Sequence, residues 1–309
     1  MNEDISAASA LAQGEIALPH FDLGEFLRRV LAEDMGSGGD VTSRATISPD
    51  ARFAAVMACR EPITLAGIEI AIAFFRSLDS EVRITRTVAD GQSVAAGTVL
   101  LKLEGNARAM LAAERSALNT LQHLSGIATL TARYVAAARG DGKGKHARLL
   151  DTRKTVPGLR LLDKYAARMG GAENHRMRMD DGLLIKDNHV VVAGGVGKAV
   201  RLAKEAKTGL QVQVEVDRID QIEEALGAGA DRLLLDNMSP DTLRQAVAVV
   251  AGRVPLEASG GINLETISGI AASGVDYVSV GRITQSAPAV DIGLDYALQE
   301  TGAPINNAR

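Results

Sequence analysis

The second half of the chain alternates short apolar stretches with helix-like segments. Segments such as IDQIEEALGAG and SPDTLRQAVAVVAG have apolar positions at helical spacing. Nearly continuous apolar stretches are typical of strands buried on both faces, and strands separated by crossover helices are parallel neighbours. We therefore predict a parallel α/β fold for this half. The six predicted strands lie within residues 147–155, 182–189, 210–217, 231–238, 254–261 and 276–282.

The first half has a mixed pattern. Apolar residues at helical spacing predict a helix over residues 21–32, and a second helix over about 107–138. The glycine-rich segment 33–43, EDMGSGGDVTS, is predicted to be a loop. Residues 1–18 are predicted to form a flexible leader, and short strands with turns are expected between 54 and 105.

The segment 83–105 alternates apolar and polar residues around the turn signals Asp90-Gly91 and Ala96-Gly97. It resembles the small β-sandwich of biotinyl and lipoyl carrier domains. A carrier needs a lysine at the hairpin tip, whereas Asp90-Gly91-Gln92 offers none. We interpret this segment as structural.

Composition narrows the class of protein. In 309 residues, 46% hydrophobic and 23% charged residues predict a folded globular protein of about two domains. Aromatic residues make up only 3%, which argues against a nucleic-acid surface built on stacked rings. A single cysteine, Cys59, excludes an internal disulfide and a thiolate zinc site. No stretch approaches the ~18 apolar residues of a membrane span, and the start of the chain lacks a signal-peptide pattern. We expect a cytoplasmic protein with no nucleic-acid or membrane partner.

Charge is distributed unevenly along the chain. The net charge is −4, yet residues 139–178 carry eleven Lys or Arg against four Asp or Glu, a local +7. A basic block in an acidic protein indicates a site for a small, highly charged anion. The alternative is a solvated helix face.

Reactive side chains follow nearly every predicted strand: Arg153, Lys154, Lys186, Glu215 and Asp236. In an α/β barrel the carboxyl ends of the strands carry the active site, whereas a doubly wound sheet gathers ligands at one switch point. This distribution favours a barrel. The chain contains neither GxGxxG before a helix nor GxxxxGK[ST], so dinucleotide-binding and P-loop motifs are absent.

Five cations are candidates for one site: Arg153, Lys154, His175, Arg176 and Lys186. A group of cations can hold carboxylates and phosphates, with arginines binding them through two hydrogen bonds. One buried lysine acting as a Schiff-base nucleophile is an alternative. Taken singly, each cation could be a surface residue or a member of an ion pair.

Two carboxylates and two glycine stretches complete the candidate chemistry. Glu215 and Asp236 could bind Mg²⁺ or sugar hydroxyls, or form structural ion pairs with Lys186 or Arg153. Residues 259–261 and 280–282 follow the last two strands, where barrels often hold phosphate.

Two motifs carry a resemblance to a known family. DTRKTVPGLRLLDKYAARMGGAENHR (151–176) and LIKDNH (184–189) are very similar to the signature of the quinolinate phosphoribosyltransferases, also called carboxylating nicotinate-nucleotide pyrophosphorylases. The similarity extends from residues 33–43 through 114–131 to 286–296. It therefore covers most of the chain in one order.

The resemblance implies an α/β fold with two domains. An N-terminal α/β sandwich would span 19–124 and be joined by 290–309, and a C-terminal incomplete α/β barrel of seven strands would span 125–289. Family members form dimers or hexamers in which one subunit covers the barrel mouth of its neighbour. The resemblance implies that Arg115 reaches the neighbouring site.

The resemblance also implies an activity, the transfer of phosphoribosyl from phosphoribosyl pyrophosphate (PRPP) to quinolinate with decarboxylation. The products would be nicotinate mononucleotide, pyrophosphate and CO₂, in NAD biosynthesis. Lys154, Lys186, Glu215 and Asp236 would be catalytic, and Glu215 and Asp236 would meet Mg²⁺. The substrate-binding residues would be Arg115, Thr152, Arg153, Lys154, His175, Arg176, Lys186, Glu215, Asp236, Ser259, Gly260, Gly261, Val280, Gly281 and Arg282.

Some positions depart from the commonest family pattern. Met177-Arg178-Met179 stands where a small or glycine-containing segment is more usual, and Arg282 and Gln285 stand where small residues or histidine often occur. A related protein of the same fold, associated with molybdenum transport, is the nearest alternative.

Overall fold

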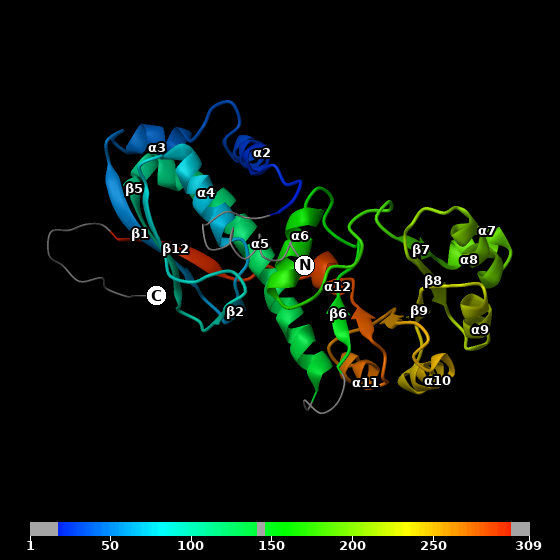
Figure 1. Ribbon diagram of the computed structural model, residues 1–309. Coiled ribbons are helices and arrows are strands. Elements are labelled where there is room, and N and C mark those ends of the chain that lie inside the picture. The colour runs from blue at the N-terminus through cyan, green and yellow to red at the C-terminus, as the bar shows by residue number, and fades with distance from the viewer. Residues whose placement is uncertain (1–17, 141–145, 298–309) are drawn as a thin grey trace. The chain divides into compact units, whose positions relative to one another are not determined.

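The computed structural model describes residues 18–140 and 146–297 (Figure 1). Nearly all of the predicted leader and the last residues of the C-terminal segment lie outside the described residues. The chain divides into two compact units, Met1–Thr129 with Pro288–Arg309, and Leu130–Ala287. This division and the predicted boundary at residue 124 both fall within one helix, α5 (Ala107–Arg139). No helix in the described part of the chain is both long and apolar enough to span a membrane.

The first unit is built on an antiparallel sheet. Its strand order is β12-β1-β5-β3, and a separate pair is formed by β2 and β4. Helix α4 contributes Ile68, Ile70, Phe74 and Phe75 to the core, because nearly all its positions are apolar. The strands are β1 (Arg52–Cys59), β2 (Ile63–Thr64), β3 (Arg83–Arg86), β4 (Ser93–Val94), β5 (Val99–Asn106) and β12 (Ile292–Ala297). The helices are α2 (Leu23–Met35), α3 (Val41–Thr46), α4 (Ile68–Leu78) and the amino-terminal part of α5.

The loop predicted over 33–43 is shorter in the structure, so both of its predicted bounds are wrong. Helix α2 continues to Met35, and α3 begins at Val41. Helix α3 is stabilised at its start by Asp40, whose carboxylate accepts a hydrogen bond from the Ser43 backbone N–H at 2.9 Å. This bond satisfies a free donor of the first turn. The glycine-rich part between the helices is a turn.

The Asp90-Gly91 turn has a structural role. The Asp90 carboxylate accepts hydrogen bonds from the backbone N–H groups of Gly67 (2.7 Å) and Ile68 (3.1 Å), where α4 begins. A carboxylate at a helix N-terminus satisfies free donors and opposes the helix dipole. The hairpin tip therefore stabilises α4.

The second unit contains a parallel sheet of six strands in the order β6-β11-β10-β9-β8-β7. Each of the six predicted apolar stretches contains one strand, which confirms the parallel α/β prediction. The strands are β6 (Arg148–Leu150), β7 (Leu183–Ile185), β8 (Val212–Val216), β9 (Arg232–Asp236), β10 (Leu256–Ser259) and β11 (Tyr277–Ser279). The connecting helices are α6 (Arg160–Met169), α7 (Asp187–Ala193), α8 (Val196–Glu205), α9 (Asp220–Gly227), α10 (Pro240–Val250), α11 (Ile267–Ala271) and α12 (Arg282–Gln285).

A seventh strand position is reduced to one residue, Glu173. It forms a parallel bridge with Leu150 of β6, and its N–H donates to Leu149 O at 2.9 Å. The strand order thus runs from Glu173 through β6 to β7, with the open side between Glu173 and β7. This arrangement is the incomplete α/β barrel that the family resemblance implied.

Candidate active site

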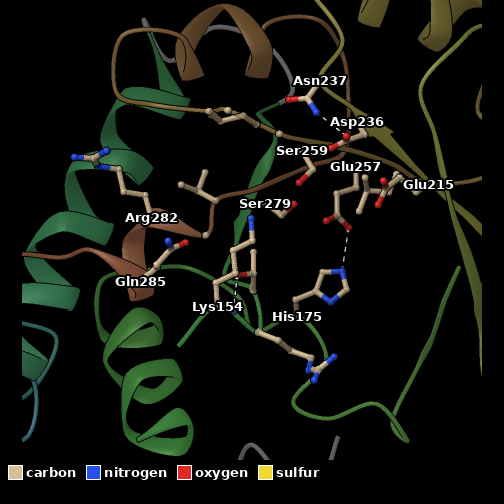
Figure 2. Close-up of a pocket in the computed structure, with 18 of the residues that line it drawn as sticks. Lys154, His175, Glu215, Asp236, Asn237, Glu257, Ser259, Ser279, Arg282 and Gln285 are labelled. Carbon is tan, nitrogen blue, oxygen red and sulfur yellow. Dashed lines mark hydrogen bonds and ion pairs between the residues drawn. The ribbon is translucent and has the colours of Figure 1, made fainter. Parts of the chain in front are cut away.

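A cavity of about 730 Å³ lies at the carboxyl ends of the barrel strands (Figure 2). Its walls come from the segments that follow β6, β7, β8, β9, β10 and β11, because parallel strands bring their ends to one edge. It contains fourteen of the fifteen predicted site residues. These are Thr152, Arg153, Lys154, His175, Arg176, Lys186, Glu215, Asp236, Ser259, Gly260, Gly261, Val280, Gly281 and Arg282.

Two arginines, Arg153 and Arg176, line the same cavity. Burial and the charge of Arg153 lower the pKa of Arg176, and the charge of Asp181 offsets this only in part. Arg176 Nη1 donates to Gly182 O at 3.0 Å, whereas Arg153 Nε is buried and has no hydrogen-bond partner among the described residues. Two repelling guanidinium groups with spare donors form a site that an anion would stabilise.

The two predicted lysines are in different environments. Lys186 Nζ lies 3.1 Å from Glu215 Oε2, so the ion pair weighed as an alternative does form for Glu215. Lys154 is exposed on the cavity wall, and Figure 2 shows its side chain pointing toward Ser279. Neither lysine lies in the apolar surroundings that activate a Schiff-base nucleophile.

Glu215 is the last residue but one of β8, and Asp236 is the last residue of the adjacent strand β9. Both lie on the same side of the cavity (Figure 2). Burial raises the pKa of Asp236, while a hydrogen bond from Asn237 Nδ2 to its Oδ2 (2.6 Å) and the charge of Lys186 act in the opposite direction. The alternative, an ion pair of either carboxylate with Arg153, does not form among the described residues. Asp236 therefore presents a partly buried carboxylate to the cavity.

Glycines after β10 and β11 allow close backbone approaches. Gly260 has φ +90°, and a Cβ there would lie 2.3 Å from Asn237 Oδ1. At Gly281 a Cβ would lie 2.7 Å from Lys154 Cδ. Only glycine fits at Gly260, because the left-handed conformation and the contact both exclude a side chain.

Comparison with known proteins agrees with this geometry. The family model for the quinolinate phosphoribosyl transferase C-terminal domain matches residues 127–295, and the model for the N-terminal domain of the same enzymes matches residues 40–125. The chain belongs to the quinolinate phosphoribosyltransferase family.

Individual relatives are similar over most of their length. A nicotinate-nucleotide pyrophosphorylase [carboxylating] from Mycobacterium leprae is 41% identical over 274 residues, covering 87% of this chain and 95% of that protein. A mitochondrial quinolinate phosphoribosyltransferase [decarboxylating] from Nicotiana tabacum is 40% identical over 297 residues, covering 90% of this chain and 83% of that protein. The structure of the nicotinate-nucleotide pyrophosphorylase from Francisella tularensis superposes with a TM-score of 0.83 at 40% identity. The match covers 89% of this chain and 96% of that chain.

Arg115 is the one predicted site residue of this family member that does not line the cavity. It is an exposed residue of α5 in the first unit. Its role in a neighbouring subunit stays a prediction. The departures Arg282 and Gln285 both line the cavity on the side opposite Glu215 and Glu257 (Figure 2).

Sequence analysis missed Glu257, which lines the cavity with a side chain only 1% exposed. It lies in the apolar stretch VPLEASGG, the context that singled out Glu215, so the same signal could have found it. His189, the last residue of the LIKDNH motif, stabilises the start of α7. Its Nδ1 accepts a hydrogen bond from the Lys186 backbone N–H at 3.0 Å.

Proposed function

We propose that this chain transfers the phosphoribosyl group of PRPP to the ring nitrogen of quinolinate and releases pyrophosphate and CO₂. The product is nicotinate mononucleotide, a precursor in NAD biosynthesis. Membership of the quinolinate phosphoribosyltransferase family supports this reaction, and the residues around the cavity supply suitable chemistry for each substrate.

The observation that carries the proposal is that Arg153 and Arg176 line one cavity and that Arg153 Nε is buried there without a hydrogen-bond partner among the described residues. Two guanidinium groups that repel each other are best stabilised by a ligand with two negative charges, and quinolinate has two adjacent carboxylates. We assign both arginines to those carboxylates, with His175 and Lys186 beside them. Charge-assisted, bidentate hydrogen bonds would fix the ring plane as well as its position.

We assign the opposite part of the cavity to PRPP. The backbone N–H groups of the glycine segments 259–261 and 280–282 would hold its 5-phosphate. Glu215 and Asp236 would accept hydrogen bonds from the ribose hydroxyls, and Lys154 would lie near the pyrophosphate. In-line placement of the two substrates supplies a large part of the rate enhancement.

The pyridine nitrogen attacks the anomeric carbon of the ribose as the bond to pyrophosphate breaks. The transition state resembles an oxocarbenium ion, and negative charge grows on the leaving group. Fixed cations such as Lys154 stabilise that charge without rearranging. The bond to the carboxylate at ring carbon 2 then breaks, CO₂ leaves, and the adjacent cationic nitrogen stabilises the electron pair until a proton replaces it.

Mg²⁺ is the proposed cofactor. Glu215 and Asp236 fit a Mg²⁺ site because this ion is typically held by one or two carboxylates, with phosphate and water oxygens completing the shell. The described residues contain no group of three or more His, Cys, Asp or Glu able to hold a metal, so most ligands would come from substrate and water. When bound, Mg²⁺ would neutralise charge on the pyrophosphate.

A product assay tests the reaction. The protein is incubated with PRPP and Mg²⁺, and with either quinolinate or nicotinate in parallel. We expect nicotinate mononucleotide and CO₂ from quinolinate alone, and loss of product when EDTA removes the metal. Equal product from nicotinate would contradict the role of the second carboxylate. No product in either tube would favour the related protein associated with molybdenum transport.

We further propose that the enzyme is a homo-oligomer, dimer or hexamer, in which Arg115 of one subunit completes the site of its neighbour. Exposure of this arginine outside the cavity of its own barrel supports the assignment. Arg115→Ala and Arg176→Ala subunits can be co-expressed with different tags. Each homo-oligomer should be inactive, whereas a mixed dimer regains one intact site of its two.

Failure of the mixed oligomer to regain activity would overturn the shared site. The cytoplasmic localisation expected from the sequence stays a prediction, which cell fractionation tests.

A further inference from the structure

The His175 ring is held on both sides by the protein. Its Nδ1 accepts the backbone N–H of Arg176 at 2.8 Å, so that nitrogen carries no proton in this arrangement. Its Nε2 lies 3.3 Å from Glu257 Oε2 (Figure 2). The ring therefore has its proton on Nε2, facing a carboxylate.

Glu257 is the second residue of β10, and its side chain is almost fully buried. Three nitrogen atoms from other segments lie close to its Oε2. Gln213 Nε2 donates a hydrogen bond to it at 2.8 Å, and His175 Nε2 and Arg232 Nη2 lie at ion-pair distances of 3.3 and 2.7 Å. Burial raises the pKa of Glu257, but its contact with His175 and the charge of Arg232 act in the opposite direction, and the net shift is downward. The contact with Arg232 thus places a positive charge directly against this buried carboxylate.

Arg232 compensates the charge of this buried carboxylate, because its Nη2 lies 2.7 Å from Glu257 Oε2. Its guanidinium carbon lies 3.9 Å from the centroid of the Tyr277 ring, and Arg148 lies 4.3 Å from the same centroid. Burial lowers the pKa of Arg232, and the charge of Glu257 opposes that effect. A paired Glu257 can lie below a site for anions without repelling them, because its charge is already neutralised.

We propose that Glu257 is the positioning residue of His175, holding the imidazole proton on Nε2 and fixing the orientation of the ring in the wall of the cavity. A neutral ring free to exchange tautomers or to rotate would present a different donor pattern to a substrate carboxylate. Glu257 acts through His175. The kinetic consequence rests on the proposed function, whereas the tautomer does not.

The test is the nitrogen NMR spectrum of the full-length protein labelled at histidine. The chain has five histidines, and a His175→Asn sample assigns the relevant signals. In the wild-type protein we expect His175 with a protonated Nε2 and an acceptor Nδ1. Glu257→Leu alone would leave Arg232 buried without a partner, so the informative sample is the double variant Glu257→Leu/Arg232→Met, which removes both charges together.

We expect His175 in the double variant to populate both tautomers. The KM for quinolinate should rise about tenfold, while the KM for PRPP stays within about twofold. Glu257→Gln retains an oxygen acceptor and should preserve the tautomer with a smaller rise in KM. Glu173→Gln is the matched control, since this residue pairs with Arg148 at 3.0 Å and does not contact His175, and it should leave all these values unchanged.

An Nε2-protonated tautomer and a wild-type KM in the folded double variant would overturn the proposal. A double variant that loses thermal stability while the His175 tautomer and the KM for quinolinate stay unchanged would also overturn it, because that result indicates a purely structural role. If the wild-type protein makes no product, the proposed function fails, and the tautomer spectra still decide the role of Glu257.

Discussion

Lys164 and Asp151 form an ion pair with no side-chain exposure to solvent. Lys164 Nζ also donates to the backbone carbonyls of His175 (2.9 Å) and Arg176 (3.2 Å). The Asp151 carboxylate accepts the His175 N–H at 2.8 Å. The pair thus fixes the end of β6 against the segment that carries two proposed ligands of the substrate carboxylates.

Removing one partner of this pair should be costly. In Lys164→Met, Asp151 would remain buried without its cation, and we expect the free energy of unfolding to fall by roughly 3–5 kcal/mol. Urea denaturation measures it. The control is Lys204→Met, because the exposed pair of Lys204 with Asp231 should contribute less than about 1 kcal/mol. Equal losses in the two variants would contradict a special role for the buried pair.

Arg176→Ala should separate activity from stability. We expect kcat/KM for quinolinate to fall by the equivalent of roughly 2–5 kcal/mol, and a similar fall for Lys186→Ala. The thermal midpoint of Arg176→Ala should change little, because the substitution also removes repulsion with Arg153. Steady-state kinetics and calorimetry on the same samples check both.

Arg178→Ala is the control for that experiment, since Arg178 is exposed and pairs with Asp180 at 2.8 Å. Its kinetic constants should match those of the wild type. An equally large loss in Arg178→Ala would indicate a general charge effect instead of a specific contact.

Gly260→Ala should impair PRPP binding. A Cβ would contact Asn237 at 2.3 Å, and φ is +90°, so the turn must shift. The control Gly252→Ala shares a positive φ of +77° but has no atom within 4 Å of its Cβ position, so it should cost only about 1 kcal/mol of backbone strain. We expect a raised KM for PRPP in Gly260→Ala alone. If the two variants have the same KM for PRPP, the close approach of Gly260 to Asn237 is not the reason that this position requires glycine.

The Asp40 cap of α3 should make part of the stability depend on pH. Its hydrogen bonds with the Ser43 side chain and backbone lower the pKa of Asp40 below its usual 3.8, against a smaller effect of burial. A lowered folded-state pKa means that the cap stabilises fully above pH 3.8 and that this contribution is lost as pH falls through the folded-state value. We expect Asp40→Ala to cost about 1 kcal/mol at pH 7.

The difference in unfolding free energy between the wild type and Asp40→Ala should shrink below pH 3.8 and vanish at lower pH. Denaturation curves from pH 7 to pH 2 measure it. A difference that stays constant over this range would show that the negative charge of Asp40 does not contribute to the cap.

The basic block predicted over 139–178 is only partly a ligand site. Arg153, Lys154 and Arg176 line the cavity. Lys164, in contrast, forms the buried ion pair with Asp151, and Arg148 forms an ion pair with Glu173. Net charge along the sequence therefore indicated the segment that contributes cations to the cavity, but it did not distinguish cavity residues from structural cations. That distinction depends on neighbours that are distant in the chain.

The sequence by itself determined the six barrel strands, the long helix α5 and the strand ends that carry the site. These features follow from local periodicity and from the rule that parallel strands place their carboxyl ends at one edge. Only the tertiary structure decided that the seventh position is a single bridge at Glu173 and that α3 forms after a glycine-rich turn. It alone also joined Glu257 to His175, Arg232 and Gln213, because these residues come from four separate segments. Their interaction depends on the pairing of neighbouring parallel strands and on burial, which bring distant charges together and make an unpaired charge costly.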